Sequence, residues 1–328
     1  MGDVRITNTH YDDVFRTLLN DCSHLIIPVI NEIFSENYSG AEKIIFSPSE
    51  HFLNQQDGNE EERITDSSFT IMGKEAKKYH LECQSNSDNS MLVRFFEYDT
   101  QIALDEGEIQ GNVLTVTLPH SAVLFLRHNS NTPDQMKIRI VTPGGGVEYD
   151  ILVMKAQRYT IEDIFKKNLL FLIPFYIFSH ENRCEEYEEN EEKLRLLELE
   201  YEQIKNKLEE FIDQRKISEY TKCTIIDMSN KVLEHIAKKY ENIRRGVKSI
   251  MGGKVLDYEA KTIRNEGLAE GMERGIERGI ERGMERGMEK GILGTVSILK
   301  NLGIPAQTIL IKIQEQYGLT PEDSRKYL

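Results

Sequence analysis

The spacing of apolar residues changes several times along the chain, and each change predicts a different kind of element. From residue 10 to residue 36 apolar side chains recur every three or four positions, which predicts helix, with a break or kink at Pro28. A further helix is predicted at about 89–106. Apolar and polar residues alternate elsewhere, and this predicts strands near residues 42–46, 63–71, 77–84, 113–118, 121–127, 136–142 and 147–155. Helices and strands in this order indicate an α/β core.

The second half of the chain has helical spacing only. Helices are predicted after Thr160, including a buried one over the apolar run 169–178, and they complete a first part at residues 1–180. Within 181–264, apolar residues at three- and four-residue steps predict an amphipathic helix with a charged outer face. Its apolar positions are Leu194, Leu197, Tyr201, Ile204, Leu208 and Phe211. The helices of this second part either dock on the first part or mediate dimerisation.

Glycine recurs every four residues between 265 and 291, with Glu and Arg at most other positions. A helix here loses roughly 1 kcal/mol per glycine relative to alanine, so other contacts would have to stabilise it. Two interpretations stay open, a weakly helical spacer and an oligomerisation helix of the coiled-coil kind. The tail, 292–328, has two short predicted helices spaced as in a small helix-turn-helix, which suits a DNA contact or a packing or dimer role.

The charge of the chain bears on its partners. With 41 basic and 55 acidic residues the formal net charge is -14, which by itself argues against a nucleic-acid partner. The acidic excess is concentrated, because residues 181–213 hold 13 acidic and 5 basic side chains. The remainder is only mildly acidic, and a local track of basic side chains for phosphate is compatible with it.

Cysteine usage and hydropathy predict the compartment. The four cysteines lie far apart without a C-x-x-C pair, so neither a zinc site nor a disulfide framework is predicted. No secretory leader precedes them, and a cytoplasmic protein is expected. The most apolar stretch, Leu169–Phe178, is too short to span a bilayer and contains Pro174, so no membrane partner is expected.

An acid and a Glu-x-Gln pair form the candidate chemical site. In the predicted strand near 77–84 the odd residues face the core while His80, Glu82 and Gln84 share the other face, because successive strand side chains alternate. A glycine-containing turn before this strand can bring Asp66 beside Glu82. Two carboxylates held close together either retain a proton or share a divalent cation, and hard oxygen ligands favour Mg²⁺ or Mn²⁺. Acids on a solvated strand face are also common without such chemistry.

Ordered motifs surround this pair. Asp12-Asp13-Val14-Phe15 precedes Asp66 and Glu82-x-Gln84, and then come Arg94-Phe95-Phe96-Glu97-Tyr98, Gly111 and a strand pair split by Pro119. The acid and the Glu-x-Gln strand resemble the PD-(D/E)XK nuclease signature, with Gln84 at the place usually held by lysine. The whole series is similar to the Rpn family of recombination-promoting nucleases and transposase-like proteins. The resemblance covers about residues 10–180, and its specificity lies in the order of the motifs.

The resemblance implies a fold, an activity and a metal site. The fold would be a restriction-endonuclease-like core, with a mixed central sheet flanked by helices, followed by an all-helical C-terminal region. The activity would be that of a metal-dependent DNA endonuclease linked to recombination or mobile elements. Asp66, Glu82 and the main-chain carbonyl of Cys83 would hold Mg²⁺ or Mn²⁺, and Gln84 would orient the attacking water or a phosphate oxygen.

Three further residues take supporting roles by the same resemblance. Asp12 would complete the metal shell or fix a helix beside the site, and Arg94 and Tyr98 would contact phosphate or brace the sheet. The alternative is a catalytically inert protein that keeps the nuclease scaffold and acts in DNA binding or oligomeric assembly. In either case we expect a homo-oligomer formed through the helical C-terminal region.

Overall fold

The chain divides into two compact units, Met1–Val255 and Leu256–Leu328. The computed structural model describes residues 10–46, 50–54, 60–64, 67–85, 90–252, 288 and 291–327. Asp66 and nearly all of the glycine repeat lie outside these residues, so the predictions for both stay predictions. Each unit is treated by itself below.

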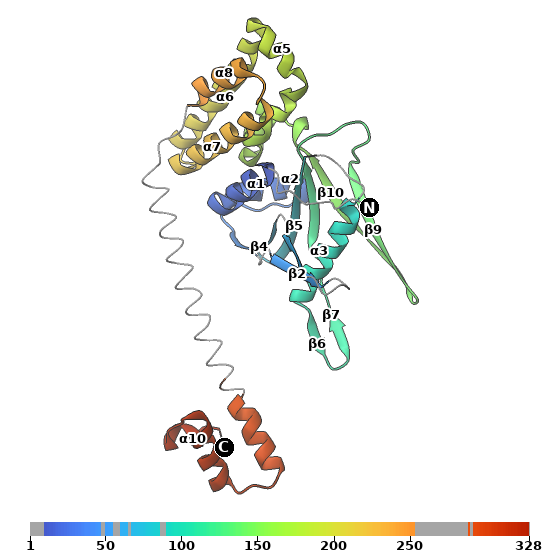
Figure 1. Ribbon diagram of the computed structural model, residues 1–328, viewed down its shortest axis with the longest axis vertical. Helices are drawn as coiled ribbons and strands as arrows, with labels where there is room; N and C mark the ends of the chain where they lie inside the picture. The colour runs from blue at the N-terminus through green and yellow to red at the C-terminus, as the bar shows by residue number, and fades with distance from the viewer. Residues whose placement is uncertain are drawn as a thin grey trace. The chain divides into compact units, whose positions relative to one another are not determined.

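A mixed sheet of six strands forms the centre of the first unit (Figure 1). Its spatial order is β1-β4-β5-β8-β10-β9. The neighbours β1, β4 and β5 are antiparallel, β8 is parallel to both β5 and β10, and β9 is antiparallel to β10. The strands are β1 (Lys43–Phe46), β4 (Ser68–Met72), β5 (Ala76–Gln84), β8 (His120–Phe125), β9 (Gln135–Thr142) and β10 (Gly145–Lys155). The predicted α/β class is confirmed at this level.

Helices cover both faces of the sheet. The parallel pair β5 and β8 needs a crossover connection, and α3 (Met91–Asp105) lies within that connection. On the α3 side, Phe95 packs in a small cluster with Val123 and Phe125 of β8. On the other side, α1 (His10–Asp21) and α2 (Ile26–Phe34) join the large core cluster. Strand β8 is therefore buried on both faces from Ser121 to Phe125, which explains its apolar run Ala122–Phe125.

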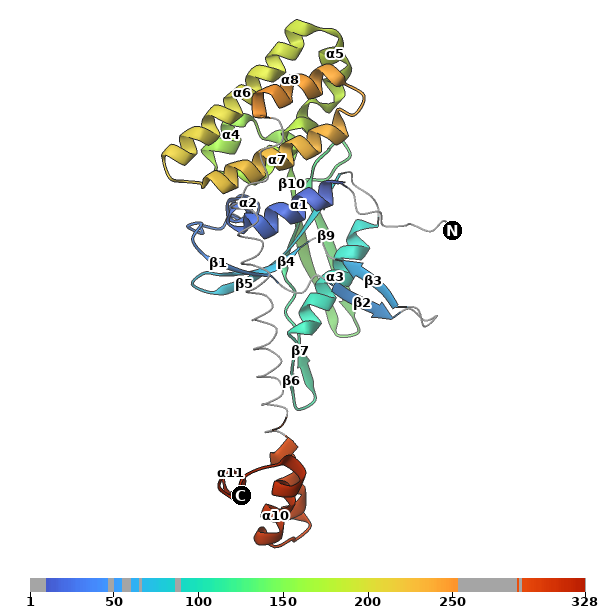
Figure 2. The same cartoon turned by 60° about the vertical axis from the view of Figure 1, so that its left-hand side comes forward.

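Helices after the last strand form a cap that belongs to the same compact unit (Figure 2). Helix α7 packs against α1 and η3, so docking on the sheet-containing part is the arrangement found. In α6, the predicted apolar positions from Leu197 to Phe211 are buried. The cap elements are η2 (Ala156–Arg158), α4 (Ile161–Lys166), η3 (Leu170–Arg183), α5 (Cys184–Glu189), α6 (Glu191–Asp213), α7 (Glu219–Ile236) and α8 (Glu241–Met251).

Several predicted element bounds are wrong. The strand predicted at 63–71 is two strands, because β3 (Glu60–Ile64) pairs with β2 (Glu50–Asn54) in a separate sheet and β4 begins at Ser68. Four of the five residues of β3 are charged, whereas Phe69 and Ile71 of β4 are fully buried in the central sheet.

Two smaller corrections concern the end of a strand and the effect of a proline. The strand predicted at 113–118 ends at Thr115, where β7 (Val113–Thr115) pairs with β6 (Glu108–Gln110) in an exposed hairpin separate from the central sheet. The predicted break at Pro28 occurs earlier, at η1 (Ser23–Leu25). Pro28 lies in the first turn of α2, where its missing N–H breaks no helical hydrogen bond.

The described part of the second unit, residues 291–327, is a small helical bundle. Residues 291–301 are helical and pack with α10 (Ala306–Tyr317) through Ile292, Val296, Ile309 and Ile313. The side chain of Thr320 caps α11 (Pro321–Arg325), whose first residue is proline. Among the described residues of both units, no helix has the length and apolar character needed to cross a membrane.

Candidate functional site

Strand β5 places His80, Glu82 and Gln84 on one face of the sheet, as its period predicts. Tyr79, Leu81 and Cys83 point to the opposite face, into the large core cluster. The first face is not solvated, since His80 is 0% and Glu82 only 5% exposed. Helix α3 covers it, with the ring centroids of Phe95 and Tyr98 at 5.1 and 6.0 Å from that of His80. Any acid on this face is therefore held in a largely dry environment.

The imidazole of His80 joins two carboxylates. Its Nδ1 lies 2.7 Å from Asp99 Oδ1, and its Nε2 lies 3.1 Å from Glu82 Oε1. The other oxygen of Glu82, Oε2, accepts a hydrogen bond of 3.3 Å from Gln84 Nε2. Asp99 comes from the middle of α3 and is fully buried. Each of the two carboxylate oxygens of Glu82 thus has a protein partner.

Two hydroxyl groups from the neighbouring strands complete the surroundings of Asp99. Ser121 of β8 donates to Asp99 Oδ1 at 2.7 Å, and Tyr149 of β10 donates to Asp99 Oδ2 at 3.1 Å. We call the set formed by His80, Glu82, Gln84, Asp99, Ser121 and Tyr149 the His80 network. It connects three neighbouring strands of the sheet to the helix that covers them.

The electrostatics of the His80 network favour a charged imidazole. Burial lowers the pKa of His80, but its hydrogen bonds to Asp99 and Glu82 outweigh burial and raise that pKa to about 9. At neutral pH both ring nitrogens then donate, one to each carboxylate. Burial and the nearby Asp99 also raise the pKa of Tyr149, so its phenol stays neutral and donates. The charged imidazole of His80 thus lies between the carboxyl groups of Asp99 and Glu82.

The chain next to Asp66 is tied directly to β5. The backbone N–H of Leu81 donates to the carbonyl of Ser67 at 3.0 Å, and Ser67 Oγ donates to the carbonyl of Leu81 at 2.8 Å. Ser68 is paired with His80 in the register of β4 and β5. Asp66 itself lies outside the described residues, and its distance from Glu82 stays a prediction. The described contacts show only that the residue following Asp66 lies against the strand that bears Glu82.

The remaining sequence-predicted residues lie in different surroundings. Tyr98 is buried on α3 against His80, and Arg94 is half-buried one turn earlier on the same helix. The side chain of Cys83 is 1% exposed in the opposite core, so only its main-chain carbonyl could serve as a ligand. Asp12 lies in the first turn of α1, whose Phe15 packs in that same opposite core.

Four members of the His80 network were not among the predicted site residues: His80, Asp99, Ser121 and Tyr149. A signal for His80 was present, because it shares the strand face of Glu82. A signal for Asp99 was present too, since it lies four residues after Phe95 and three before Ile102, on the buried stripe of α3. Ser121 and Tyr149 carry no local signal, because only the strand register brings them to Asp99.

The atoms around Glu82 that could bind a metal ion are of the type that a hard cation prefers. Within the described ranges, no three His, Cys, Asp or Glu side chains form a group that could hold a metal ion. The Glu82 carboxylate, the Gln84 amide oxygen and the Cys83 carbonyl are all oxygen donors, which Mg²⁺ and Mn²⁺ prefer. Glu82 is one carboxylate of the predicted pair. The other is Asp66, which lies outside the described residues.

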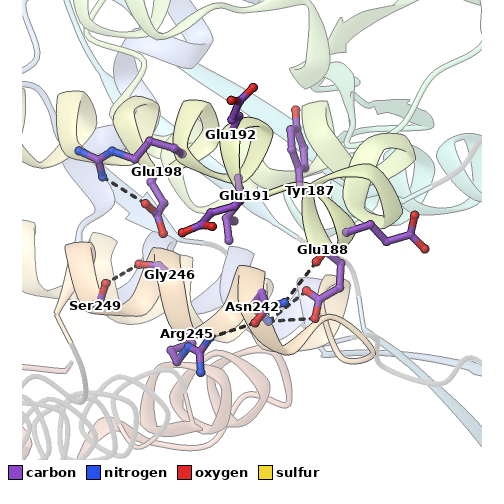
Figure 3. A pocket seen from close by; sticks show the side chains of 12 residues that line it. Tyr187, Glu188, Glu191, Glu192, Glu198, Asn242, Arg245, Gly246 and Ser249 are labelled. Carbon is purple, nitrogen blue, oxygen red and sulfur yellow. Dashed lines mark hydrogen bonds and ion pairs between the residues drawn. The ribbon is translucent and has the colours of Figure 1, made fainter.

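An open groove of about 950 Å³ lies in the cap, between α5, α6 and α8 (Figure 3). Its polar groups serve helix packing. Glu188 accepts the backbone N–H of Asn242 at 3.0 Å and so caps the first turn of α8. Arg195 donates to Glu198 at 3.1 Å, and Glu198 lies directly over Gly246 of α8. The groove is acidic, and its carboxylates belong to the exposed side of the cap.

Comparisons of the chain with protein-family models, with curated proteins and with solved structures find no match. The residues of the chain and their geometry are therefore the basis for a functional assignment.

Proposed function

We propose that this chain is a metal-dependent DNA endonuclease of the PD-(D/E)XK type, with Asp66, Glu82 and Gln84 in its active site. One observation carries the proposal. Glu82 and Gln84 lie side by side on one face of a central strand, in contact through a 3.3 Å hydrogen bond, and the residue after Asp66 is bonded to the same strand. The mixed sheet between helices agrees with the core that the resemblance implies.

The roles of the residues follow from their chemistry. Asp66, Glu82 and the main-chain carbonyl of Cys83 would hold Mg²⁺ or Mn²⁺. When bound, such a cation lowers the pKa of a water ligand and neutralises charge on a phosphate. Gln84 can orient a water or a phosphate oxygen through its amide, but an amide neither takes a proton nor carries charge at neutral pH.

The distribution of charge is compatible with a DNA substrate. The acidic run 181–213 covers the end of η3 and the helices α5 and α6 of the cap, so much of the net charge of -14 lies in the cap and not on β5. Recombination or movement of genetic elements is the cellular role that the resemblance suggests for such an enzyme.

A second candidate, an inert nuclease scaffold that binds DNA or assembles oligomers, has a specific observation in its favour. Both oxygens of Glu82 already have protein partners, and its side chain is almost completely buried. An enzyme must open this face to admit a phosphate, whereas a scaffold need not. The endonuclease would bind metal and cleave DNA, whereas the inert scaffold would do neither. Measurements of metal binding and of DNA cleavage therefore distinguish the two.

Cleavage of supercoiled plasmid by the purified full chain separates the two candidates. We expect wild type to nick the plasmid with Mg²⁺ or Mn²⁺ and not with EDTA. Asp66→Asn and Glu82→Gln keep the side-chain shape and should reduce the rate by on the order of 100-fold or more. Glu75→Gln is the matched control, because Glu75 is an exposed acid in the turn between β4 and β5.

Cleavage that survives in both site variants would show that the active site lies elsewhere. Wild type that neither binds Mn²⁺ nor cleaves any plasmid would establish the inert scaffold.

A further inference from the structure

The His80 network contains two buried residues that the proposed function does not use directly, His80 and Asp99. We infer that they are positioning residues for Glu82: they hold its Oε1, so that Oε2 is the oxygen directed to Gln84 and to a bound cation. This inference rests on the proposed function and extends it.

The imidazole ring of His80 is held at both of its nitrogens. Nδ1 is 2.7 Å from Asp99 and Nε2 is 3.1 Å from Glu82, and the ring is fully buried between aromatic side chains of α3. A ring held in this way cannot rotate without breaking both hydrogen bonds. The orientation of Glu82 is therefore linked to the position of α3.

Asp99 is itself fixed from a third direction. The hydroxyl groups of Ser121 and Tyr149 donate to its two oxygens, at 2.7 and 3.1 Å. With the His80 nitrogen, Asp99 accepts three hydrogen bonds in a site without solvent exposure. The full set is satisfied, which is the condition under which a buried polar network is rigid.

Core packing alone does not explain these residue types. A buried charged pair loses solvation, and apolar residues of similar volume often stabilise a core equally well. The neighbours at this level of the sheet, Val123 and Phe125, are apolar. The polar residues instead form one path from α3 to a single oxygen of Glu82. Partners of this kind behind a ligating carboxylate typically contribute 10- to 100-fold to metal affinity or activity.

Metal affinity measured without DNA tests the inference. Isothermal titration of Mn²⁺ into the metal-free full chain gives the Kd for wild type, His80→Gln, Asp99→Asn and Glu82→Gln. We expect His80→Gln and Asp99→Asn to weaken binding about 10- to 100-fold. His120→Gln is the control, because His120 lies on the adjacent strand β8 but contacts the rings of Phe34 and Tyr79 instead of Glu82. It should leave the Kd unchanged.

The Mn²⁺ dependence of plasmid cleavage distinguishes a role in positioning Glu82 from a role in the stability of the fold. Plasmid cleavage in His80→Gln should need more Mn²⁺ for half-maximal rate, and high Mn²⁺ should restore most of the wild-type rate. Asp99→Asn should add nothing to the loss of binding in a Glu82→Gln background, because the two residues act through the same carboxylate. If a variant fails to fold, as seen by circular dichroism, Ser121→Ala and Tyr149→Phe each remove a single hydrogen bond and should weaken Mn²⁺ binding in a smaller step.

The outcomes are distinguishable. Wild type that binds Mn²⁺ and cleaves, with folded His80 and Asp99 variants of unchanged Kd, overturns the positioning role and leaves the proposed function intact. Wild type that binds no Mn²⁺ overturns both. Weaker binding in the His80 and Asp99 variants with a normal His120→Gln establishes the inference.

Discussion

Among the described residues of the first unit, His80 and His180 are both buried beside carboxylates, but His80 lies between two carboxylates and His180 between a carboxylate and a tyrosine hydroxyl. In the cap, His180 Nδ1 is 2.8 Å from the Tyr187 hydroxyl. Its Nε2 is 2.9 Å from Glu200 Oε2, near enough for an ion pair but outside hydrogen-bond geometry. Tyr176 donates to the same Glu200 oxygen at 2.7 Å. We call these four residues the His180 network.

The two networks have similar residue types but differ in burial and in the elements that they join. The side chain of Glu200 is 35% exposed, so water screens its interaction with His180, whereas Asp99 is 0% exposed. The His180 network joins consecutive elements of the cap, η3, α5 and α6. The His80 network joins a helix to three strands and ends at Glu82 and Gln84. The two networks therefore differ in burial and in the residues at which they end, more than in residue type. The His80 network can affect the candidate site, whereas the His180 network holds neighbouring helices of the cap together.

Removing one carboxylate from each network should give the largest difference between them. Asp99→Ala removes one of the two carboxylates that pair with the buried His80, and it should lower the free energy of unfolding by about 3–5 kcal/mol. Glu200→Ala should cost roughly 1 kcal/mol or less, because solvent reaches that site. Urea unfolding followed by circular dichroism measures both. Equal losses for the two variants would remove the distinction drawn between the networks.

Removing one hydroxyl donor from each network should give a smaller contrast. Ser121→Ala deletes a buried hydrogen bond to a charged acceptor and should cost about 1.5–3 kcal/mol. Tyr176→Phe deletes a bond to the partly exposed Glu200 and should cost about 0.5–1.5 kcal/mol. The same urea titrations provide the values. A larger loss for Tyr176→Phe than for Ser121→Ala would reverse the ranking of the two sites.

The free energy of unfolding should depend on pH through Glu200 in the cap. Burial raises the pKa of Glu200, but His180 and Tyr176 lower it more, so the folded-state pKa lies below its ordinary value. The unfolded chain therefore takes up a proton first as pH falls. The stabilising contribution is complete above the unfolded pKa, about 4.3, and is lost as pH falls through the folded pKa.

The measurement is the difference in unfolding free energy between wild type and Glu200→Gln at pH 7 and near pH 3. We expect that difference to stay below about 1 kcal/mol at pH 7 and to shrink on acidification. A difference that grows toward acid pH would contradict the lowered pKa.

The smallest expected effect concerns the packing of α6 on α8 in the cap. Gly246→Ala should gain up to about 1 kcal/mol of helix propensity in α8. The new Cβ would overlap Glu198 Oε1, but that atom ends a flexible side chain that can move away. Its pairing with Arg195 would be weakened, at a cost of a few tenths of a kcal/mol, about 0.3. Net stabilisation of about 0.5 kcal/mol by urea unfolding is expected, and Glu198→Ala in the same background should restore the full gain.

Local periodicity was enough to predict much of the fold. The strands near 136–142 and 147–155, the helix at about 89–106 and the buried face of α6 all depend on residues close together in sequence, and all of them are found. The predictions failed where pairing partners compete. Residues 60–64 have a strand pattern, but their partner is the strand at residues 50–54 and not a strand of the central sheet.

For the site itself, the sequence determined that His80, Glu82 and Gln84 share one face, because strand side chains alternate whatever the rest of the chain does. Only the tertiary structure decided that this face is covered and that His80 meets Asp99, 19 residues later. The position of α3 over β5 depends on the packing of Phe95 against β8, and the positions of Ser121 and Tyr149 depend on strand register. Such long-range contacts arise from burial summed over the whole core, so no local pattern can specify them.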